Sequence, residues 1–208
     1  MDSIQQEAII EYARKTIVQM GVKALRMDDI AQATRTSKRT LYETFKDKEE
    51  LLFLAVREHF DAFDRRNGDM AKNAPNILIA ILIVIEQVRK NSELNWSIVT
   101  SLKRFYPHIY HRVLNDKADL KKKFIRKALN LGIKQGYIEK RINPELTMSV
   151  LNYIAMGISE NNEAFDIPDG ISVNNVFWDV LITYIRGVCT PKGVQIIDGY
   201  LETNKKLK

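Results

Sequence analysis

Residues 29–50 constrain the fold more than any other part of this chain. The segment DIAQATRTSKRTLYETFKDKEE predicts two short helices joined by a tight polar turn, followed by the start of a third helix. The middle helix is small, basic and rich in hydroxyl groups. Only Leu41 and Phe45, four residues apart on one face, can anchor it to its neighbours. A helix of this kind suits the major groove of DNA.

The composition limits the class of protein. With 208 residues, 45% of them hydrophobic, the chain can form one large domain or a small head and a larger body. The longest apolar run, residues 77–85, is shorter than the roughly 20 residues that span a bilayer, and no apolar signal segment begins the chain. A single cysteine, Cys189, excludes an intrachain disulfide. We therefore expect a cytoplasmic protein that does not bind membranes.

The net charge of +6 is unevenly distributed along the chain. Residues 1–66 carry 12 Lys or Arg and 12 Asp or Glu, whereas residues 112–141 carry 10 basic and 3 acidic residues. The overall charge is therefore weak evidence for DNA binding, and the local excess of five basic over two acidic residues in 35–48 carries more weight. The basic run 117–127 forms a solvated face or contacts DNA or an acidic ligand, and these alternatives stay open.

Helical spacing of apolar residues recurs along nearly the whole chain, so the sequence predicts an all-α fold. The polar segment 65–69 is the expected boundary between a head, residues 1–66, and a body, residues 67–208. The expected helices run from Ser3 to Gly21, from Met27 to Ala33, from a Thr36 or Ser37 cap to Phe45, and over 48–65, 75–90, 93–104, 107–136 with a break near 115–116, 143–165 and 172–187.

The third expected helix, which ends at Phe45, presents a second face that fits DNA. Lys38 and Tyr42 share this face, and their ammonium and hydroxyl groups suit phosphates, while Arg39 can present two donors to a guanine. Lys48 begins the next helix, where its charge adds to free backbone N–H groups. The alternative is a solvated helical hairpin. The candidate DNA-binding residues are Arg35, Thr36, Ser37, Lys38, Arg39, Thr40, Tyr42 and Lys48.

These features resemble the TetR family of transcriptional regulators. The matching segments are 27–31 (MDDIA), 37–42 (SKRTLY) and 45–52 (FKDKEELL). The resemblance implies a three-helix, helix-turn-helix head with its motif at about 26–45, a connecting helix 48–65, and a helical body that binds a small molecule and dimerises. It also implies a repressor that binds a palindromic operator in double-stranded DNA. The family's usual glycine turn is Thr34-Arg35-Thr36 here, and a non-glycine residue with positive φ costs about 1 kcal/mol.

The implied effector site requires a largely apolar pocket in the body. Large aromatic and thioether side chains on helices expected to converge are its candidates, although each of them can equally fill the core. These candidates are Trp96, Tyr106, Tyr110, Phe124, Met148, Tyr153, Met156 and Trp178.

Two late helices carry apolar faces suited to association. In the resembled family such a pair meets its symmetry mate as a four-helix bundle, and a two-fold dimer is what a palindromic site requires. The candidate interface residues are Val150, Ile154, Ile158, Phe177, Val180, Leu181 and Tyr184.

Signs of catalysis are absent from the sequence. It contains no glycine-rich phosphate loop, nucleophile elbow or zinc-protease motif. His108 and His111 have a spacing compatible with metal but lack further ligands, so we expect no metal and no cofactor. The rival interpretation is an all-helical enzyme or interaction module whose N-terminal hairpin is incidental.

Overall fold

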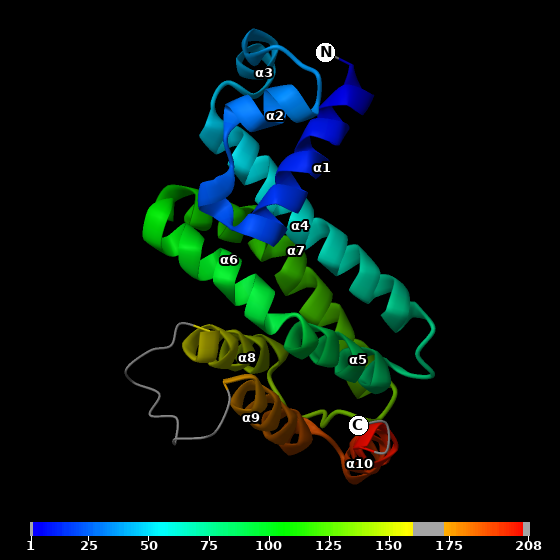
Figure 1. Cartoon of the computed structure of the whole chain (residues 1–208). Helices are drawn as coiled ribbons and strands as arrows, with labels where there is room; N and C mark the ends of the chain where they lie inside the picture. Colours follow the sequence, from blue (N-terminus) through cyan, green and yellow to red (C-terminus); the bar gives the residue numbers. More distant parts are fainter. Residues whose placement is uncertain (1, 160–172, 206–208) are drawn as a thin grey trace. The chain divides into compact units, whose positions relative to one another are not determined.

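The computed structural model describes residues 2–159 and 173–205, and it confirms the all-α prediction (Figure 1). Within these residues the only β-structure is an isolated bridge between Ile138 and Cys189. None of the described helices has the length and apolar character needed to cross a membrane. The helices are α1 (Ser3–Met20), η1 (Val22–Ala24), α2 (Met27–Ala33), α3 (Lys38–Phe45), α4 (Lys48–Lys72), α5 (Ile77–Lys90), α6 (Ser92–Phe105), α7 (Pro107–Lys134), α8 (Pro144–Ser159), α9 (Val173–Val188) and α10 (Pro191–Lys205).

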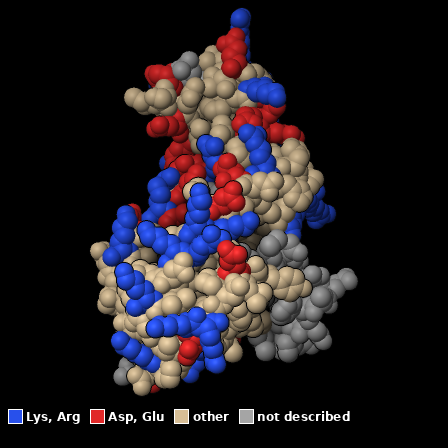
Figure 2. Space-filling model, turned by 180° about the vertical axis from the view of Figure 1, so that it is seen from behind, with Lys and Arg blue, Asp and Glu red and all other residues tan. Residues whose placement is uncertain are grey.

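The chain divides into two compact units. The first contains residues 1–66 and 93–118, and the second contains residues 67–92 and 119–208. Residues 93–118, which the sequence assigned to the body, thus belong with the head. Two long helices, α4 and α7, run from one unit into the other. On the face drawn in Figure 2, basic and acidic side chains are mixed in the upper part of the view, and basic side chains predominate in the lower part.

The core of the first unit joins the head to parts of α6 and α7. Fully or nearly fully buried side chains come from α1 (Ile9, Ala13, Ile17), α2 (Met27, Ile30), α3 (Leu41, Phe45), α4 (Leu51, Leu52, Phe53), α6 (Ile98, Leu102) and α7 (Ile109, Tyr110, Val113). Burial of this size stabilises the unit by roughly 1.5–3 kcal/mol per large apolar side chain. The head is therefore mounted on α6 and the first turns of α7 through one continuous apolar core.

Several helix ends differ from the sequence prediction. Helix α1 begins at Ser3 as predicted and ends at Met20 rather than Gly21, and Asp2 caps it because its carboxylate accepts a 2.7 Å hydrogen bond from the Gln5 N–H. The predicted boundary segment 65–69 is helical, since α4 continues to Lys72 with Asn67 buried despite the unfavourable Gly68. The predicted break near 115–116 does not occur in α7. The predicted end of the 143–165 helix lies outside the described residues.

The sequence prediction missed α10 entirely. This helix begins at Pro191, and the Thr190 hydroxyl accepts a 3.2 Å hydrogen bond from the Gly193 N–H in its first turn. A Cβ at Gly193 would lie 2.2 Å from the carbonyl oxygen of Tyr137, so only glycine fits there. Ile197 of α10 is fully buried with Leu78 and Leu82 of α5. The helix thus completes the core of the second unit.

A polar pair supports the same core. The Tyr200 hydroxyl donates a 2.6 Å hydrogen bond to Glu86, and Lys90 pairs with the same carboxylate at 3.0 Å. Partial burial opposes ionisation of Glu86, but these two donors outweigh it and hold its pKa below the usual value. Burial and this hydrogen bond raise the pKa of Tyr200. The pair therefore stays a neutral phenol and a carboxylate at neutral pH.

Candidate nucleic-acid interface

Two buried side chains and one cap fix α3. Leu41 has no exposed surface and Phe45 retains 3%. The Ser37 hydroxyl accepts a 3.0 Å hydrogen bond from the Thr40 N–H, so Ser37 is the cap that the sequence left open between two residues. Tyr42, between the two anchors, is 47% exposed. The helix thus turns one face into the core and offers the other to a partner.

The basic side chains of α3 are held by acidic neighbours. The ammonium group of Lys38 lies 2.5 Å from Asp28 of α2, and this hydrogen bond raises the pKa of Lys38. The guanidinium of Arg39, whose side chain is 88% exposed, lies 2.8 Å from Glu43 one turn further on. Exposed ion pairs of this kind are weak, so they orient the cations while leaving them able to exchange a carboxylate for a phosphate.

The turn before α3 contains a residue with positive φ, although the family's usual glycine is absent from it. Arg35 has a φ of 51°, in the left-handed region, and its side chain is exposed. Thr36 is buried, with 8% of its surface exposed. Its hydroxyl donates to the Thr34 carbonyl at 3.2 Å and accepts from the Gln5 amide at 3.2 Å. Of these two candidates, Arg35 is accessible, whereas the Thr36 hydroxyl is already used to hold the turn against α1.

A second left-handed residue, Lys46, follows α3. It has φ 64° and ψ −58°, and the Asp47 N–H donates to the Phe45 carbonyl at 2.6 Å across it. This is the strained form of a three-residue turn. Strain in a non-glycine residue is often kept at functional sites, and Lys46 is exposed. Sequence reasoning missed Lys46 as a candidate, and the only signal was its place in the short link between two helices.

The start of α4 differs in one respect from the expected phosphate site. Asp47 caps the helix by accepting a 2.7 Å hydrogen bond from the Glu50 N–H, so one backbone donor is already occupied. The ammonium of Lys48 lies 3.2 Å from the Tyr106 hydroxyl and 5.8 Å from the centre of its ring. Lys48 therefore occupies a defined position at the N-terminus of α4, where a phosphate is electrostatically favoured.

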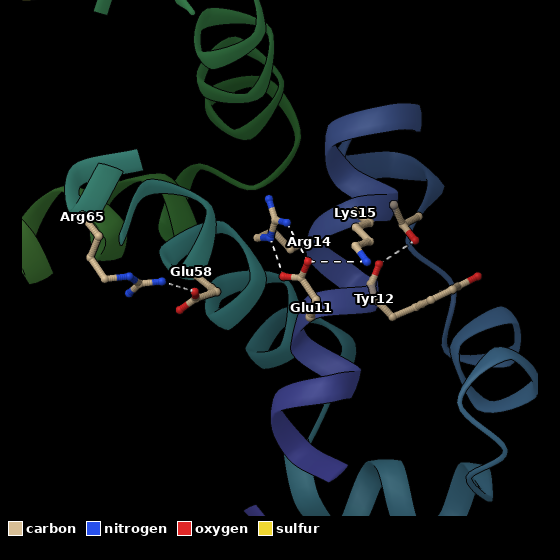
Figure 3. A network of polar contacts seen from close by, with 7 residues as sticks. Glu11, Tyr12, Arg14, Lys15, Glu58 and Arg65 are labelled. Carbon is tan, nitrogen blue, oxygen red and sulfur yellow. Dashed lines mark hydrogen bonds and ion pairs between the residues drawn. The ribbon is translucent and has the colours of Figure 1, made fainter. Parts of the chain in front are cut away.

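Ion pairs form within α1 and, separately, within α4 (Figure 3). Arg14 donates two hydrogen bonds to Glu11, at 2.6 and 2.7 Å, and Lys15 lies 3.7 Å from the same carboxylate. The hydrogen bond to Arg14 lowers the pKa of Glu11. On α4, Arg65 pairs with Glu58 at 2.6 Å. These contacts help order the helices that carry α2 and α3.

The candidate pocket residues come from both units. Of those in the first unit, Tyr110 is buried and Trp96 and Tyr106 are partly buried. In the second unit, Met148 is buried, Trp178 packs beside the Arg89 guanidinium at 5.2 Å, and Phe124 and Tyr153 are 57% and 77% exposed. The side chain of Met156 lies outside the described residues.

Each unit has a surface hollow among its described residues, and neither of these two hollows is lined by a pocket candidate. One, of about 480 Å³, lies in the second unit and is lined by Arg126, Asn130, Arg141, Ile142, Asn143, Pro144 and Glu145. The other, of about 660 Å³, lies in the first unit and is lined by Phe53, Arg57, His108, His111, Arg112, Asn115 and Asp116. The apolar effector pocket therefore stays a prediction.

The candidate dimer residues are unequal in exposure. Val150, Ile154, Val180 and Tyr184 are partly buried, Leu181 is 5% exposed, and the side chains of Ile158 and Phe177 lie outside the described residues. Leu146 and Tyr153 of α8 are 64% and 77% exposed. Tyr153, a pocket candidate, thus lies with Leu146 and Val150 at the i, i+4 and i+7 positions of an apolar helix face.

No group of three or more His, Cys, Asp or Glu side chains suited to a metal ion occurs among the described residues. Instead, His108 lies 2.8 Å from Glu49, and His111 contacts the Tyr110 ring edge to face. Burial raises the pKa of Cys189 to about 11, so its thiol is un-ionised at neutral pH and is packed rather than reactive.

Comparisons with known proteins agree with this geometry. Residues 9–55 match the family model described as bacterial regulatory proteins, tetR family. An uncharacterised HTH-type transcriptional regulator of Bacillus subtilis (strain 168), YhgD, is 29% identical over 161 residues, which cover 73% of this chain and 82% of that protein.

Solved structures share the fold at lower identity. A putative transcriptional regulator from Saccharomonospora viridis, in complex with choline, has a TM-score of 0.67 and 18% identity, and the match covers 91% of this chain and all of that one. AibR, in complex with isovaleryl coenzyme A and operator DNA, has a TM-score of 0.53 and 19% identity, with 88% and 97% covered. The similarity thus extends over both the head and the body.

Proposed function

The chain belongs to the TetR family of DNA-binding transcriptional regulators, and we propose that it is a repressor that binds a palindromic operator as a homodimer and is released by a small molecule. The observation that carries the proposal is the mounting of α3. Leu41 and Phe45 are buried, while Lys38, Arg39 and Tyr42 are exposed, and ion pairs with neighbouring side chains orient Lys38 and Arg39. The family consists of regulators rather than enzymes.

The proposed contacts with DNA are of two kinds, to phosphates and to a base. Lys38, Lys46, Lys48 and the Tyr42 hydroxyl are suited to phosphates, which set the register of α3 in the groove. Arg39 donates its Nε–H to Glu43, and its two terminal Nη groups can donate to the O6 and N7 atoms of guanine. The test is a mobility shift with DNA taken from around the protein's own gene, measured over a range of salt concentrations. Loss of each phosphate contact reduces the salt slope by about one unit.

We assign the dimer contact to α8 and α9. The support is the apolar face of α8 on which Leu146 and Tyr153 are exposed and Val150 is partly buried, which water would otherwise cover. Leu181 is too deeply buried to test the contact, since changing it would disturb the core of the second unit. The better variant is Tyr153→Arg, because its side chain is exposed and a charge there would face the partner helix.

Sedimentation tests this assignment. Tyr153→Arg should convert the dimer to a monomer and weaken operator binding, because one head cannot hold two half-sites. Met20→Arg is the matched control: Met20 is 71% exposed, lies on α1 and should leave the dimer intact. A dimer that survives Tyr153→Arg unchanged would place the contact elsewhere.

The effector is a small molecule that we expect to be largely apolar. The S. viridis protein and AibR, which share this fold, were solved with choline and isovaleryl coenzyme A, so the ligand chemistry of such bodies varies widely. The large side chains of the body, including Met148 and Trp178, support an apolar contact. A regulator of this kind acts where the DNA lies, in the cytoplasm.

Helix α4 is the route by which the effector would act. It is 25 residues long, or about 37 Å, and is continuous from Lys48 into the second unit. A small tilt would change the separation of the two recognition helices from the roughly 34–36 Å that successive grooves require. A coupling of about 1–3 kcal/mol suffices for induction. Once an effector is found, its affinity must fall when operator is bound, and equal affinity in both states would disprove this route.

A further inference from the structure

The first turn of α4 is held by residues from the start of α7. Three successive residues of α4 take part, and each has its own partner in the segment 106–112. The ammonium of Lys48 lies 3.2 Å from the Tyr106 hydroxyl, and the carboxylate of Glu49 lies 2.8 Å from His108. Glu50 accepts two hydrogen bonds from Arg112, one of them 2.9 Å long. All of these residues belong to the first unit.

The segment that provides these partners is itself firmly mounted. Between and beside them, Ile109, Tyr110 and Val113 are buried in the core that also contains Leu41 and Phe45 of α3. The Arg112 guanidinium lies 3.6 Å from the centre of the buried Phe53 ring, a cation–π contact that adds to its pair with Glu50. The hydrogen bond to Glu50 raises the pKa of Arg112. The partners of α4 are therefore fixed by packing.

These partners reduce electrostatic repulsion at the proposed phosphate site. Acidic residues in the first turn stabilise a helix through its dipole, but Glu49 and Glu50 directly follow Lys48 and would repel a DNA phosphate. Arg112 compensates the charge of Glu50, and His108, when protonated, compensates that of Glu49. The Tyr106 hydroxyl accepts one of the three N–H groups of Lys48 and leaves two for a phosphate.

We propose that Tyr106, His108 and Arg112 are positioning residues of the DNA-binding surface. They hold the start of α4 in register with α3, orient the Lys48 ammonium, and shield the DNA from the carboxylates beside it. This inference rests on the proposed function, because it assumes that Lys48 binds a phosphate of the operator. It extends the DNA-binding determinants to a segment of the chain 58 residues beyond Lys48.

The first test distinguishes an effect of the Glu50 charge on DNA binding from a disturbance of the fold. Arg112→Gln leaves Glu50 uncompensated, and operator affinity should fall about fivefold to tenfold, the loss expected for one phosphate contact. Arg112→Lys, which keeps the charge, should retain most of the affinity. The double variant Arg112→Gln with Glu50→Gln removes both charges and should return affinity to within about twofold of the parent, because no uncompensated carboxylate is left.

The second test asks whether Tyr106 acts through Lys48. Tyr106→Phe keeps the ring but removes the hydroxyl, and it should weaken operator binding about threefold in the parent and not at all in a Lys48→Ala background. A purely structural tyrosine would have the same effect in both backgrounds. Arg126→Gln is the matched control, because Arg126 forms a comparable exposed pair with Glu145 at 2.7 Å in the second unit.

The outcomes distinguish this inference from the proposed function. If the parent binds operator and Arg112→Gln binds equally well, the positioning role is wrong while the regulator stands. If the parent binds no DNA specifically, the proposed function fails, and amide hydrogen exchange of residues 51–54 tests the contacts alone. Arg112→Gln should accelerate that exchange relative to Arg126→Gln. Unchanged exchange would show that Arg112 does not hold the first turn of α4.

Discussion

Two basic regions of this chain look alike in sequence and differ in structure. In residues 35–48, Lys38, Arg39 and Lys48 each have a partner, namely Asp28, Glu43 and Tyr106. In the run 117–127, the lysines at 121, 122 and 123 are exposed, and the described residues offer them no ion pair. Among the side chains of that run that the structure describes, Arg126 is the one with an ion pair, to Glu145.

The difference separates two uses of positive charge. A cation held at a fixed position on a rigid helix can select a phosphate or a base edge. A cation on a solvated helix attracts any polyanion, and the attraction weakens with salt. We therefore assign operator recognition to the head and treat the run in α7 as a general electrostatic contribution. The predictions below test this assignment, beginning with the largest effect.

Removing the anchor of α3 should have the largest consequence. Leu41→Ala deletes a fully buried side chain and should destabilise the first unit by about 2–5 kcal/mol. Chemical denaturation followed by circular dichroism measures the loss, and specific DNA binding should disappear with it. Leu120→Ala, on an exposed part of α7, is the control and should change the midpoint little. Equal midpoints for the two variants would show that α3 is not anchored as described.

Arg39→Ala should have the next largest effect. If Arg39 binds a guanine, its removal should cost about 1–3 kcal/mol of discrimination at one position in each half-site. Fluorescence anisotropy with operators altered at single base pairs measures this cost. Lys123→Ala removes one charge from the other basic region and should leave the base preference intact. Unchanged base preference in Arg39→Ala would move base reading to another residue.

Lys46→Gly should have opposite effects on stability and on binding. Glycine adopts positive φ without strain, so the variant should gain up to about 1 kcal/mol in the free energy of unfolding. It should also lose one phosphate contact, which a smaller salt slope in the anisotropy titration would reveal. A variant that is more stable and still binds with the parent's slope would show that the strained turn serves the fold alone.

Neutralising the solvated run should have the smallest effect on recognition. The variant with Lys121, Lys122 and Lys123 all changed to Gln should bind operator within about twofold of the parent at 0.15 M salt, where exposed charges are largely screened. Fluorescence anisotropy at several salt concentrations compares the operator affinity of this triple variant with that of Lys38→Ala. A tenfold loss would mean that α7 contacts DNA directly, and the two basic regions would then share one function.

The sequence was sufficient where local rules decide the structure. The caps, the spacing of Leu41 and Phe45, and the matching segments around Ser37 predicted α2 and α3 and the all-α class. These features depend on residues close together in the chain. The positive φ of Arg35 follows the family's usual glycine turn rather than any local signal in this sequence.

Sequence patterns of neighbouring residues were insufficient where contacts between residues far apart in the chain determine the structure. The polar segment 65–69 resembles a linker, yet it is helical with Asn67 buried. Residues 93–118 join the head because their apolar side chains complete its core, which no local pattern reveals. The pocket candidates were chosen by residue type, which does not determine which helices meet, so they stay a prediction. The pairing of Lys48 with Tyr106 is also beyond sequence reasoning for this reason.

The most direct test of the central claim is a competition experiment on operator recognition. Labelled DNA from around the protein's own gene is titrated with the parent and with Lys38→Ala at 0.15 M salt, in the presence of unlabelled DNA of scrambled sequence. We predict that the parent binds the specific fragment at least about 10³-fold more tightly than the scrambled DNA, and that Lys38→Ala weakens binding to both alike. Equal affinity of the parent for the specific and the scrambled DNA, whatever the fragment taken from that region, would contradict the assignment of α3 as a sequence-reading helix.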